Sequence, residues 1–583
     1  MMLDRSRQGL LPYAWALAAL VVSLSTVALV VSCTGPLPDT CDPLGTCGPV
    51  DAGPTDAGPV DAGNDREADV VTDDAADVAS ESVVCDPTKA PKYAPCALDN
   101  AYGVFVASPV GGDGGPDAGA GGLGSGSGDG SMSQPYATIT QALANLGGKT
   151  RIYVCNGLYS EQVSVTTAVS VYGGLSCARG STGRVWTYTG ASAEVRSPSP
   201  AYALSVTGVS SGVVTFEDVS FGSPTATVAG SSSIAALIAS SSVKLSRVRL
   251  SPGNGATGAD GAVTPNYTGP APSGGAQVWS SPGGLFGAYS GGAGGVNRCL
   301  QFGSSAGGDG GLGCATGLGT AGTASPQAPV TMAGRDGLPM GVSPVGDGGA
   351  AMTATANDPG ADGVAGEGVA APSQVYGALS PTGWTPSSGG DGAPGKPGQG
   401  GAGATDPLYG LCTNPMQSIG GGGGGAGGCG GAGGKGGGGG GASIALASVQ
   451  STVNLTDCIL IAAAAGTGGS GGAGQDGQAG GPGGDDSSFP QQHAPGAPGG
   501  NGAGGSGGAG GTGGISVGIL SMGSTITSDA ATSQSTMLGP PGAGGVAGAG
   551  GRHSLAGVLT TGMDGRSGAP GSAGTSVALL KLM

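Results

Sequence analysis

The side chains that could do chemistry in this sequence are few. Charged residues make up 10% of its 583 residues, and the histidines are His493 and His553. Hydrolysis of a glycosidic bond needs two carboxylates at a fixed separation, and polysaccharide lyases need a base as well as acidic groups. Both histidines lie in glycine-rich stretches with no partner acid or serine in a recognisable motif, so we expect no catalytic residue. The remaining candidates, at outward positions of predicted strands, are Glu161, Glu217, Asp218, Lys244, Arg247, Arg249 and Asp457.

Three of these candidates, Asp218, Arg247 and Asp457, occupy equivalent positions of an internal repeat. They could therefore form a ladder of charges on one outer face of the protein. Such a ladder could be a catalytic or ligand-binding set, or a row of paired charges that keeps the face soluble. We favour the row of paired charges.

Motifs for bound ions or phosphates are incomplete. Calcium-binding nonapeptide repeats need an apolar residue two places after the Asp and tandem copies, and the sequence has neither. Gly436 follows Gly434-Lys435 where a phosphate loop requires Ser or Thr. We therefore expect no metal ion and no cofactor, and turns at the recurring Asp-Gly dipeptides. These dipeptides begin at Asp113, Asp260, Asp309, Asp336, Asp347, Asp362, Asp391 and Asp476.

A few aromatic residues in the glycine-rich half have two interpretations. They could stack on sugar rings, or they could anchor the local packing of a long insertion. The sequence leaves both open. The residues are Trp279, Phe286, Tyr289, Tyr376 and Trp384.

The composition sets limits on these candidates. Glycine accounts for 131 residues and aromatic residues for 4%, and most of the glycine follows residue 250. A compact enzyme core is not expected from such a chain, because glycine has no side chain to bury and loses the most backbone freedom on folding. The net charge of −17 argues against a nucleic acid partner.

The first 84 residues indicate export and tethering. Arg5 and Arg7 precede an apolar run that ends in Val30-Val31-Ser32-Cys33, which resembles the lipobox of bacterial lipoproteins. The resemblance implies a signal peptide over 1–32 and lipidation of Cys33, and a plain transmembrane anchor is the alternative. Residues 33–84 are acidic and proline-rich, which predicts an extended, disordered tether. We expect an exported protein, anchored by lipid to the outer membrane or cell surface.

The twelve cysteines fit an oxidising compartment. A zinc site is not expected, because the sequence has no Cys-x-x-Cys motif and few histidines. Cys458 is left over and stands on an inner row of the repeat, so we expect it to be a buried thiol. Sequence spacing does not determine connectivity, and our hypothesis is nearest-neighbour pairing. The resulting pairs are Cys41 with Cys47, Cys85 with Cys96, Cys155 with Cys177, Cys299 with Cys314 and Cys412 with Cys429.

An internal repeat predicts a stack of β-coils. Segments 201–221, 233–250 and 443–460 align, the last two without a gap, and each contains two strands joined by a serine-rich corner. Stacked coils lie about 4.8 Å apart and bury a continuous row of apolar side chains. The expected core is Val163, Val165, Val169, Val171, Val214, Phe216, Val219, Phe221, Val243, Leu245, Val248, Leu250, Val453, Leu455, Cys458 and Leu460.

Residues 131–177 add a family resemblance. Gln134-Pro135-Tyr136-Ala137-Thr138-Ile139, Ile152-Tyr153-Val154 and Gly157-Leu158-Tyr159 resemble the first coil of pectin-lyase-like proteins, including bacterial members of unknown function. The resemblance implies an all-β fold, a short right-handed parallel β-helix. The Asn-Thr-Asp, Gly-His-Gly and Arg-Ile-Lys motifs of related pectin hydrolases are absent. The expected parts are a cysteine module and linker (85–130), coils (131–251, 443–465, 515–538, 575–583) and glycine-rich insertions (252–442, 466–514, 539–574).

The insertions carry glycine at every third residue, as in 389–401 and 496–514. Period three is typical of polyproline II chains. A bundle of polyglycine helices hydrogen-bonded side by side and a flexible disordered loop are equally compatible with it. Collagen is disfavoured, because the runs are short and poor in proline. The composition is similar to that of PGRS-type glycine-rich surface proteins.

These observations predict a non-catalytic lipoprotein of the cell envelope with a structural or adhesive role. Its expected partners are the membrane, through the lipid anchor, and envelope polysaccharide or neighbouring cells. The alternative is a carbohydrate-active β-helix enzyme, either a lyase or a hydrolase.

Overall fold

The computed structural model describes residues 85–108, 128–180, 183–276, 291–300, 303–310, 359–370, 376–404, 421–485, 495–553 and 564–583. The predictions for the signal peptide 1–32, Cys33 and the tether lie outside these residues. None of the described helices is long and apolar enough to cross a membrane. The short helices are η1 (Pro95–Ala97), α1 (Ile139–Ala144) and α2 (Ala530–Gln534).

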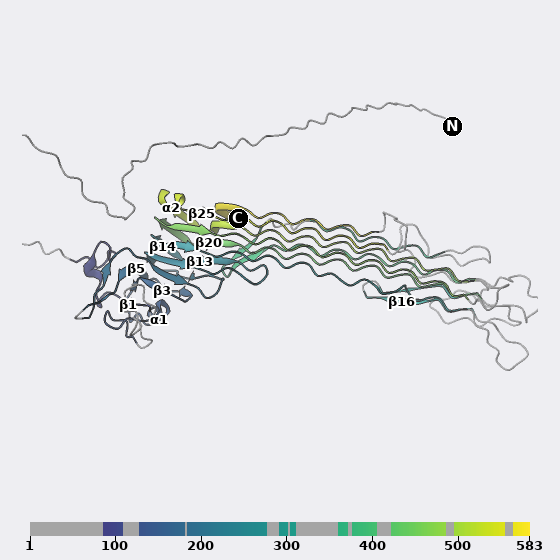
Figure 1. Cartoon of the computed structure of the whole chain (residues 1–583), viewed down its shortest axis with the longest axis horizontal. Helices are drawn as coiled ribbons and strands as arrows, with labels where there is room; N and C mark the ends of the chain where they lie inside the picture. The colour runs from purple at the N-terminus through teal and green to yellow at the C-terminus, as the bar shows by residue number, and fades with distance from the viewer. Residues whose placement is uncertain are drawn as a thin grey trace, which may run out of the picture. The chain divides into compact units, whose positions relative to one another are not determined.

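Three parallel sheets wind into a β-helix, which confirms the predicted all-β fold (Figure 1). Sheet A contains β1 (Val104–Val106), β2 (Arg151–Cys155), β5 (Ser170–Ser176), β11 (Val214–Glu217), β14 (Ser242–Ser246), β21 (Thr452–Thr456) and β24 (Thr525–Ser528). Sheet B contains β3 (Gly157–Tyr159), β9 (Ala193–Arg196), β12 (Val219–Gly222), β15 (Arg249–Ser251), β22 (Ile459–Ala462) and β25 (Met537–Leu538). Sheet C contains β4 (Val163–Val165), β10 (Leu204–Thr207), β13 (Ser233–Ala239), β20 (Ser443–Val449), β23 (Ser516–Met522) and β26 (Ser576–Leu582).

The remaining strands are antiparallel additions. β8 (Thr187–Tyr188) pairs with the end of β5. Three hairpins are β6 (Arg179–Gly180) with β7 (Gly183–Arg184), β16 (Val296–Cys299) with β17 (Gly303–Ala306), and β18 (Gly377–Ser380) with β19 (Gly383–Pro386).

The repeat seen in the sequence is the stacking register of the coils. Val243 is paired with Val214 on one side and with Val453 on the other. Each of the sixteen expected core residues is at most 2% exposed, and all belong to one apolar cluster inside the β-helix. Burial of a side chain of this size contributes about 1.5–3 kcal/mol, so the inner rows are the main source of stability in this region.

Helix α1 covers part of the first coil. Ile139 and Ala142 are fully buried against the core, while Thr138 caps the helix by accepting a hydrogen bond from the Gln141 backbone N–H. The Glu161 carboxylate accepts hydrogen bonds from the backbone N–H groups of Ile139 (2.8 Å) and Thr140 (2.9 Å). Glu161, an outward candidate in the sequence, therefore has a structural role at the beginning of α1.

Two of the five expected disulfides are present. Cys85 is bonded to Cys96, and Cys155 is bonded to Cys177. Cys41 and Cys47 both lie outside the described residues. The expected bond between Cys41 and Cys47 therefore stays a prediction.

Two of the expected pairings are wrong. Cys299 is bonded to Cys429 instead of Cys314, so Cys429 does not pair with Cys412 either. The fold places hairpin β16–β17 beside a distant glycine-rich segment, and nearness in sequence therefore does not give nearness in space. Cys314 and Cys412 lie outside the described residues, and Cys458 is a free, buried thiol as predicted.

The described parts of the insertions form one body, here called the glycine bundle, of extended segments that run side by side (Figure 1). The segments are joined by backbone hydrogen bonds, as in the packed-bundle interpretation. For these residues the disordered-loop and collagen interpretations are wrong. The segments are 255–275, 292–295, 307–310, 359–366, 387–404, 421–442, 466–484, 496–514, 542–553 and 565–574.

Successive residues of one bundle segment bond to different neighbours. The backbone N–H groups of Gly505, Ser506 and Gly507 donate to the carbonyl groups of Gln475 (3.0 Å), Ala393 (2.8 Å) and Arg566 (2.9 Å). A methyl group on Gly505 would collide with the carbonyl oxygen of Ala432. Glycine is therefore required where segments approach this closely.

A row of serines marks where the chain re-enters the β-helix. Each of four sheet C strands begins with a serine whose hydroxyl donates to a backbone carbonyl group just after the preceding strand. Ser443 donates to Gly253 (2.9 Å), although 190 residues separate them. The exit and the return of the longest insertion are therefore adjacent, as the sequence repeat predicts. The pairs are Ser233–Pro224, Ser443–Gly253, Ser516–Ala463 and Ser576–Gly539.

Candidate functional site

The ladder of charged residues lies at the corners between sheets A and B. Asp218, Arg247 and Asp457 have φ angles of 55°, 53° and 53°, the left-handed conformation that turns the chain from one strand to the next. This conformation is uncommon for residues other than glycine, and the tight corner imposes it. The equivalence inferred from the repeat is therefore correct.

The Arg247 guanidinium closes this cluster by pairing with both neighbouring acids. Its Nε lies 2.8 Å from Asp218 Oδ1, and its Nη2 lies 2.9 Å from both Asp218 Oδ2 and Glu217 Oε2. The hydrogen bonds to Asp218 raise the pKa of the guanidinium above its usual range, although burial opposes the charge. Tyr188 donates a hydrogen bond to Asp218 Oδ2 (3.2 Å). Burial raises the pKa of the Tyr188 hydroxyl, and the negative charge of Asp218 raises it further.

These contacts make the cluster a self-paired network. Both Asp218 oxygens and one Glu217 oxygen are engaged by Arg247, which remains protonated over the accessible pH range. A general base needs a free lone pair directed at a substrate proton. The geometry thus fits the interpretation of paired charges.

The other outward candidates do not join this cluster. Lys244 and Arg249 are exposed on the outer faces of sheets A and B respectively. The backbone N–H of Asp457 donates to the Asp529 carboxylate (2.9 Å), which fixes the corner of the next coil. Only Glu217, Asp218 and Arg247 of the seven candidates are brought together.

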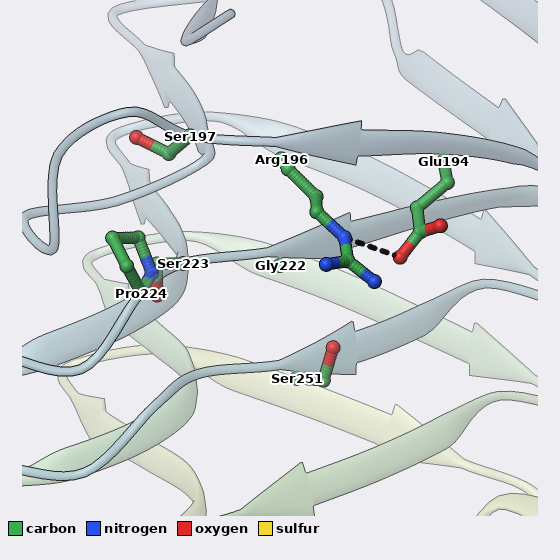
Figure 2. Close-up of a pocket in the computed structure, with 7 residues that line it drawn as sticks. All are labelled: Glu194, Arg196, Ser197, Gly222, Ser223, Pro224 and Ser251. Atoms are coloured by element: carbon green, nitrogen blue, oxygen red, sulfur yellow. Dashed lines mark hydrogen bonds and ion pairs between the residues drawn. The ribbon is translucent and has the colours of Figure 1, made fainter. Parts of the chain in front are cut away.

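A shallow groove that the sequence did not reveal lies on sheet B (Figure 2). Its volume is about 200 Å³. Residues Arg196, Gly222 and Ser251 are directly adjacent on three successive strands, β9, β12 and β15. The residues that line this groove, here called the sheet B groove, are Glu194, Arg196, Ser197, Gly222, Ser223, Pro224 and Ser251.

The sheet B groove combines hydrogen-bond donors and acceptors. Arg196 Nε donates to Glu194 Oε1 (2.8 Å), and both side chains are about half exposed or more. Among the described residues, the Arg196 Nη groups and Glu194 Oε2 have no further partner. Charged and hydroxyl groups are therefore available to a ligand at the place where Gly222 leaves the face open.

The Asp-Gly dipeptides join bundle segments, so the prediction of turns is wrong where the structure describes them. Each of these carboxylates accepts a hydrogen bond from a backbone N–H of an adjacent segment. The pairs are Asp260–Ser470, Asp309–Gly294, Asp362–Asn501, Asp391–Gly436 and Asp476–Arg552. Asp113, Asp336 and Asp347 lie outside the described residues.

His553 has an acid partner that its sequence position does not reveal. Its buried imidazole has Nε2 3.3 Å from Asp362 Oδ2, between two bundle segments. Among the described residues, no group of three or more His, Cys, Asp or Glu could hold a metal ion. His493 lies outside the described residues.

Two of the five aromatic candidates pack against the β-helix. Trp384 and Leu379 of hairpin β18–β19 are buried in an apolar cluster on the outer face of sheet C, and Tyr376 packs against that cluster. The interpretation as local packing anchors is correct for Tyr376 and Trp384. Trp279, Phe286 and Tyr289 lie outside the described residues.

Comparison with known proteins gives one result. Residues 122–233 match a family described as a protein of unknown function, DUF1565. This range ends at the first residue of β13, so it covers the first coils of the β-helix and about a fifth of the chain. No curated protein and no solved structure matched the chain. The match supports the β-helix fold and carries no activity.

Proposed function

We propose that this protein is a non-catalytic component of the bacterial cell envelope with a structural or adhesive role. In this proposal a lipid on Cys33 anchors the chain, and the β-helix together with the glycine bundle forms a scaffold outside the membrane. The scaffold contacts envelope polysaccharide or neighbouring cells.

The observation that carries the proposal is the dense network of backbone hydrogen bonds inside the glycine bundle, which is most complete in its central segment. Segment 496–514 bonds to six others. Representative pairs are Gly499–Gly481, Gly500–Gln399, Gly507–Arg566, Gly360–Pro498, Gly425–Ala497 and Gly542–Gly514. Backbone hydrogen bonds from one segment to six neighbours favour one fixed arrangement. Such a body suits a scaffold better than a catalytic lid that opens and closes.

The charged side chains support the same assignment. Asp218 and Glu217 are engaged by Arg247, and the described Asp-Gly carboxylates are engaged by backbone N–H groups of adjacent segments. Catalysis by a carbohydrate-active enzyme requires carboxylates available to the substrate. The described carboxylates of this kind serve the fold.

The test uses the purified full chain on surfaces coated with peptidoglycan, lipopolysaccharide and neutral polysaccharides. We expect retention on at least one surface, with no release of reducing ends or unsaturated sugars. Release over many turnovers that disappears in Asp218→Asn would contradict the proposal and support the enzyme alternative. Asn is a suitable replacement because it also tolerates the left-handed conformation of this corner.

A further inference from the structure

The sheet B groove lies where three coils offer polar side chains in register. One row across the strands is Arg196, Gly222 and Ser251, and the neighbouring row is Glu194, Ser220 and Arg249. Figure 2 shows the Arg196 guanidinium and the Ser251 hydroxyl on either side of Gly222. The hollow therefore coincides with the missing side chain of Gly222.

The backbone does not require glycine at this position. Gly222 has no positive φ, and an added Cβ would lie 3.4 Å from Ser251 Oγ, an ordinary van der Waals contact. Most glycines of the bundle differ, because an added Cβ there would collide with backbone atoms. Gly222 thus keeps open a space that the fold could fill with a side chain.

The polar groups of the groove suit a neutral ligand rich in hydroxyl groups. Arg196 supplies N–H donors, Glu194 Oε2 is an acceptor, and the Ser251 hydroxyl can donate or accept. The Glu194–Arg196 pair is neutral as a unit, with 2.8 Å between Nε and Oε1. Within the lining of the groove an anionic ligand would face the Glu194 carboxylate, since Arg249, in the neighbouring row, is not one of the residues that line it.

The size and the margins of the groove point to one sugar ring. Its volume of about 200 Å³ is below the roughly 300–1,000 Å³ typical of sites for larger ligands. Leu158 and Ile459, both more than a third exposed, flank the second row beside Glu194 and Arg249. Apolar side chains at the margin can contact the C–H groups of neighbouring sugar units.

We propose that the sheet B groove binds a single unit of a neutral polysaccharide. The ligand class rests on the proposed adhesive function, and the placement rests on Gly222, Arg196 and Glu194. A small, open site of this kind gives a dissociation constant on the order of millimolar for one unit.

The experiment titrates the full chain with soluble oligosaccharides of glucose, mannose and galactose, and with oligogalacturonate as a charged probe. We expect a neutral oligosaccharide to bind with higher affinity than oligogalacturonate. Gly222→Leu should weaken this binding at least tenfold while the melting temperature stays within a few degrees of wild type. Lys244→Leu, which adds the same side chain on sheet A, should bind as wild type does.

Each contrary result overturns a separate statement. Equal binding by folded Gly222→Leu would refute the groove and leave the adhesive function standing. Tighter binding of oligogalacturonate would refute the neutral ligand. If wild type binds no probe, the groove proposal fails, while retention on envelope surfaces still decides the proposed function. Should Gly222→Leu fail to fold, the double variant Glu194→Gln, Arg196→Gln applies the same criterion without adding volume.

Discussion

The β-helix and the glycine bundle share one repeat but differ in what holds their segments together. An offset of 210 residues relates Val243 to Val453 in the β-helix, and also Asp260 to Ser470 in the bundle. In the β-helix, neighbouring coils are joined by strand pairing around buried side chains. In the bundle, the segments approach until backbone meets backbone, and side chains are confined to the remaining positions.

The difference predicts opposite tolerances to mutation. A core position of the β-helix needs an apolar side chain, and a swap to another apolar side chain of similar volume costs less than about 1.5 kcal/mol. A contact position of the bundle needs the absence of a side chain, because one methyl group would displace a backbone hydrogen bond. The glycine content rises with the number of neighbouring segments. Segment 565–574 bonds to two segments and has glycine at every third residue. Segment 496–514 bonds to six segments and has glycine at about two residues in three.

The largest effect is expected for Val243→Asp. Val243 is fully buried in the inner row, so an unpaired carboxylate there costs several kcal/mol and should unfold the β-helix. Lys244→Asp, one residue along on the exposed face, is the matched control. Circular dichroism with thermal melting measures both. A cooperative melt of Val243→Asp near the wild-type temperature would mean that the inner rows are not the source of stability.

Gly505→Ala should damage the bundle while leaving the β-helix folded. The added methyl group meets the Ala432 carbonyl, and overpacking of this kind costs about 1–3 kcal/mol. Ala543→Val, at an exposed third position, is the control that adds volume on the surface of the bundle. Native-state hydrogen exchange reads the two regions separately. Unchanged protection around Gly505 would show that the segments do not pack this closely.

Ser443→Ala tests the junction between the two regions. The hydroxyl donates to the Gly253 carbonyl (2.9 Å) and accepts from the Ala463 N–H (2.8 Å), and loss of such a buried group costs about 1–3 kcal/mol. Ser242→Ala, which removes the hydroxyl of a half-buried serine in a strand, is the control. Chemical denaturation should give a lower free energy of unfolding only for Ser443→Ala. Equal values would argue that the serine row does not hold the insertion.

The smallest expected effect is on the stability of the bundle at low pH. A side-chain hydrogen bond from Lys435, together with one from the Gly436 N–H, lowers the pKa of Asp391. The pKa of an Asp side chain in the unfolded chain is about 3.9. The stability that this pair contributes is therefore present above pH 4 and is lost as the pH falls through the lower pKa of Asp391 in the folded protein. The pair is exposed, which limits its contribution to less than about 1 kcal/mol. Asp391→Asn should make the bundle less sensitive to pH between 5 and 2, and the same sensitivity as wild type would refute this role.

The sequence predicts the β-helix well because its signal is repeated. Val214, Val243 and Val453 recur in one register, and stacking is the direct physical consequence. The bundle was open to two interpretations, since a period of three does not show whether neighbouring segments meet. The Cys299–Cys429 bond was missed because its partners lie 130 residues apart in a region without a side-chain pattern.

The sheet B groove had no sequence signal for a similar reason. It forms only when Arg196, Gly222 and Ser251 become adjacent on three coils. One glycine among many carries no information until its contacts show that the backbone does not need it. The charged cluster was easier to predict, because Asp218 and Arg247 align in the repeat itself.

The central claim is that the glycine-rich segments form one hydrogen-bonded bundle continuous with the β-helix. Hydrogen–deuterium exchange on the full chain measures it directly, with peptides from 421–442 and 496–514 compared with peptides from β13 and β20. We expect the amides of both glycine-rich segments to be protected for as long as those of the strands. Complete exchange of 421–442 and 496–514 within seconds, with the strands still protected, would contradict the account.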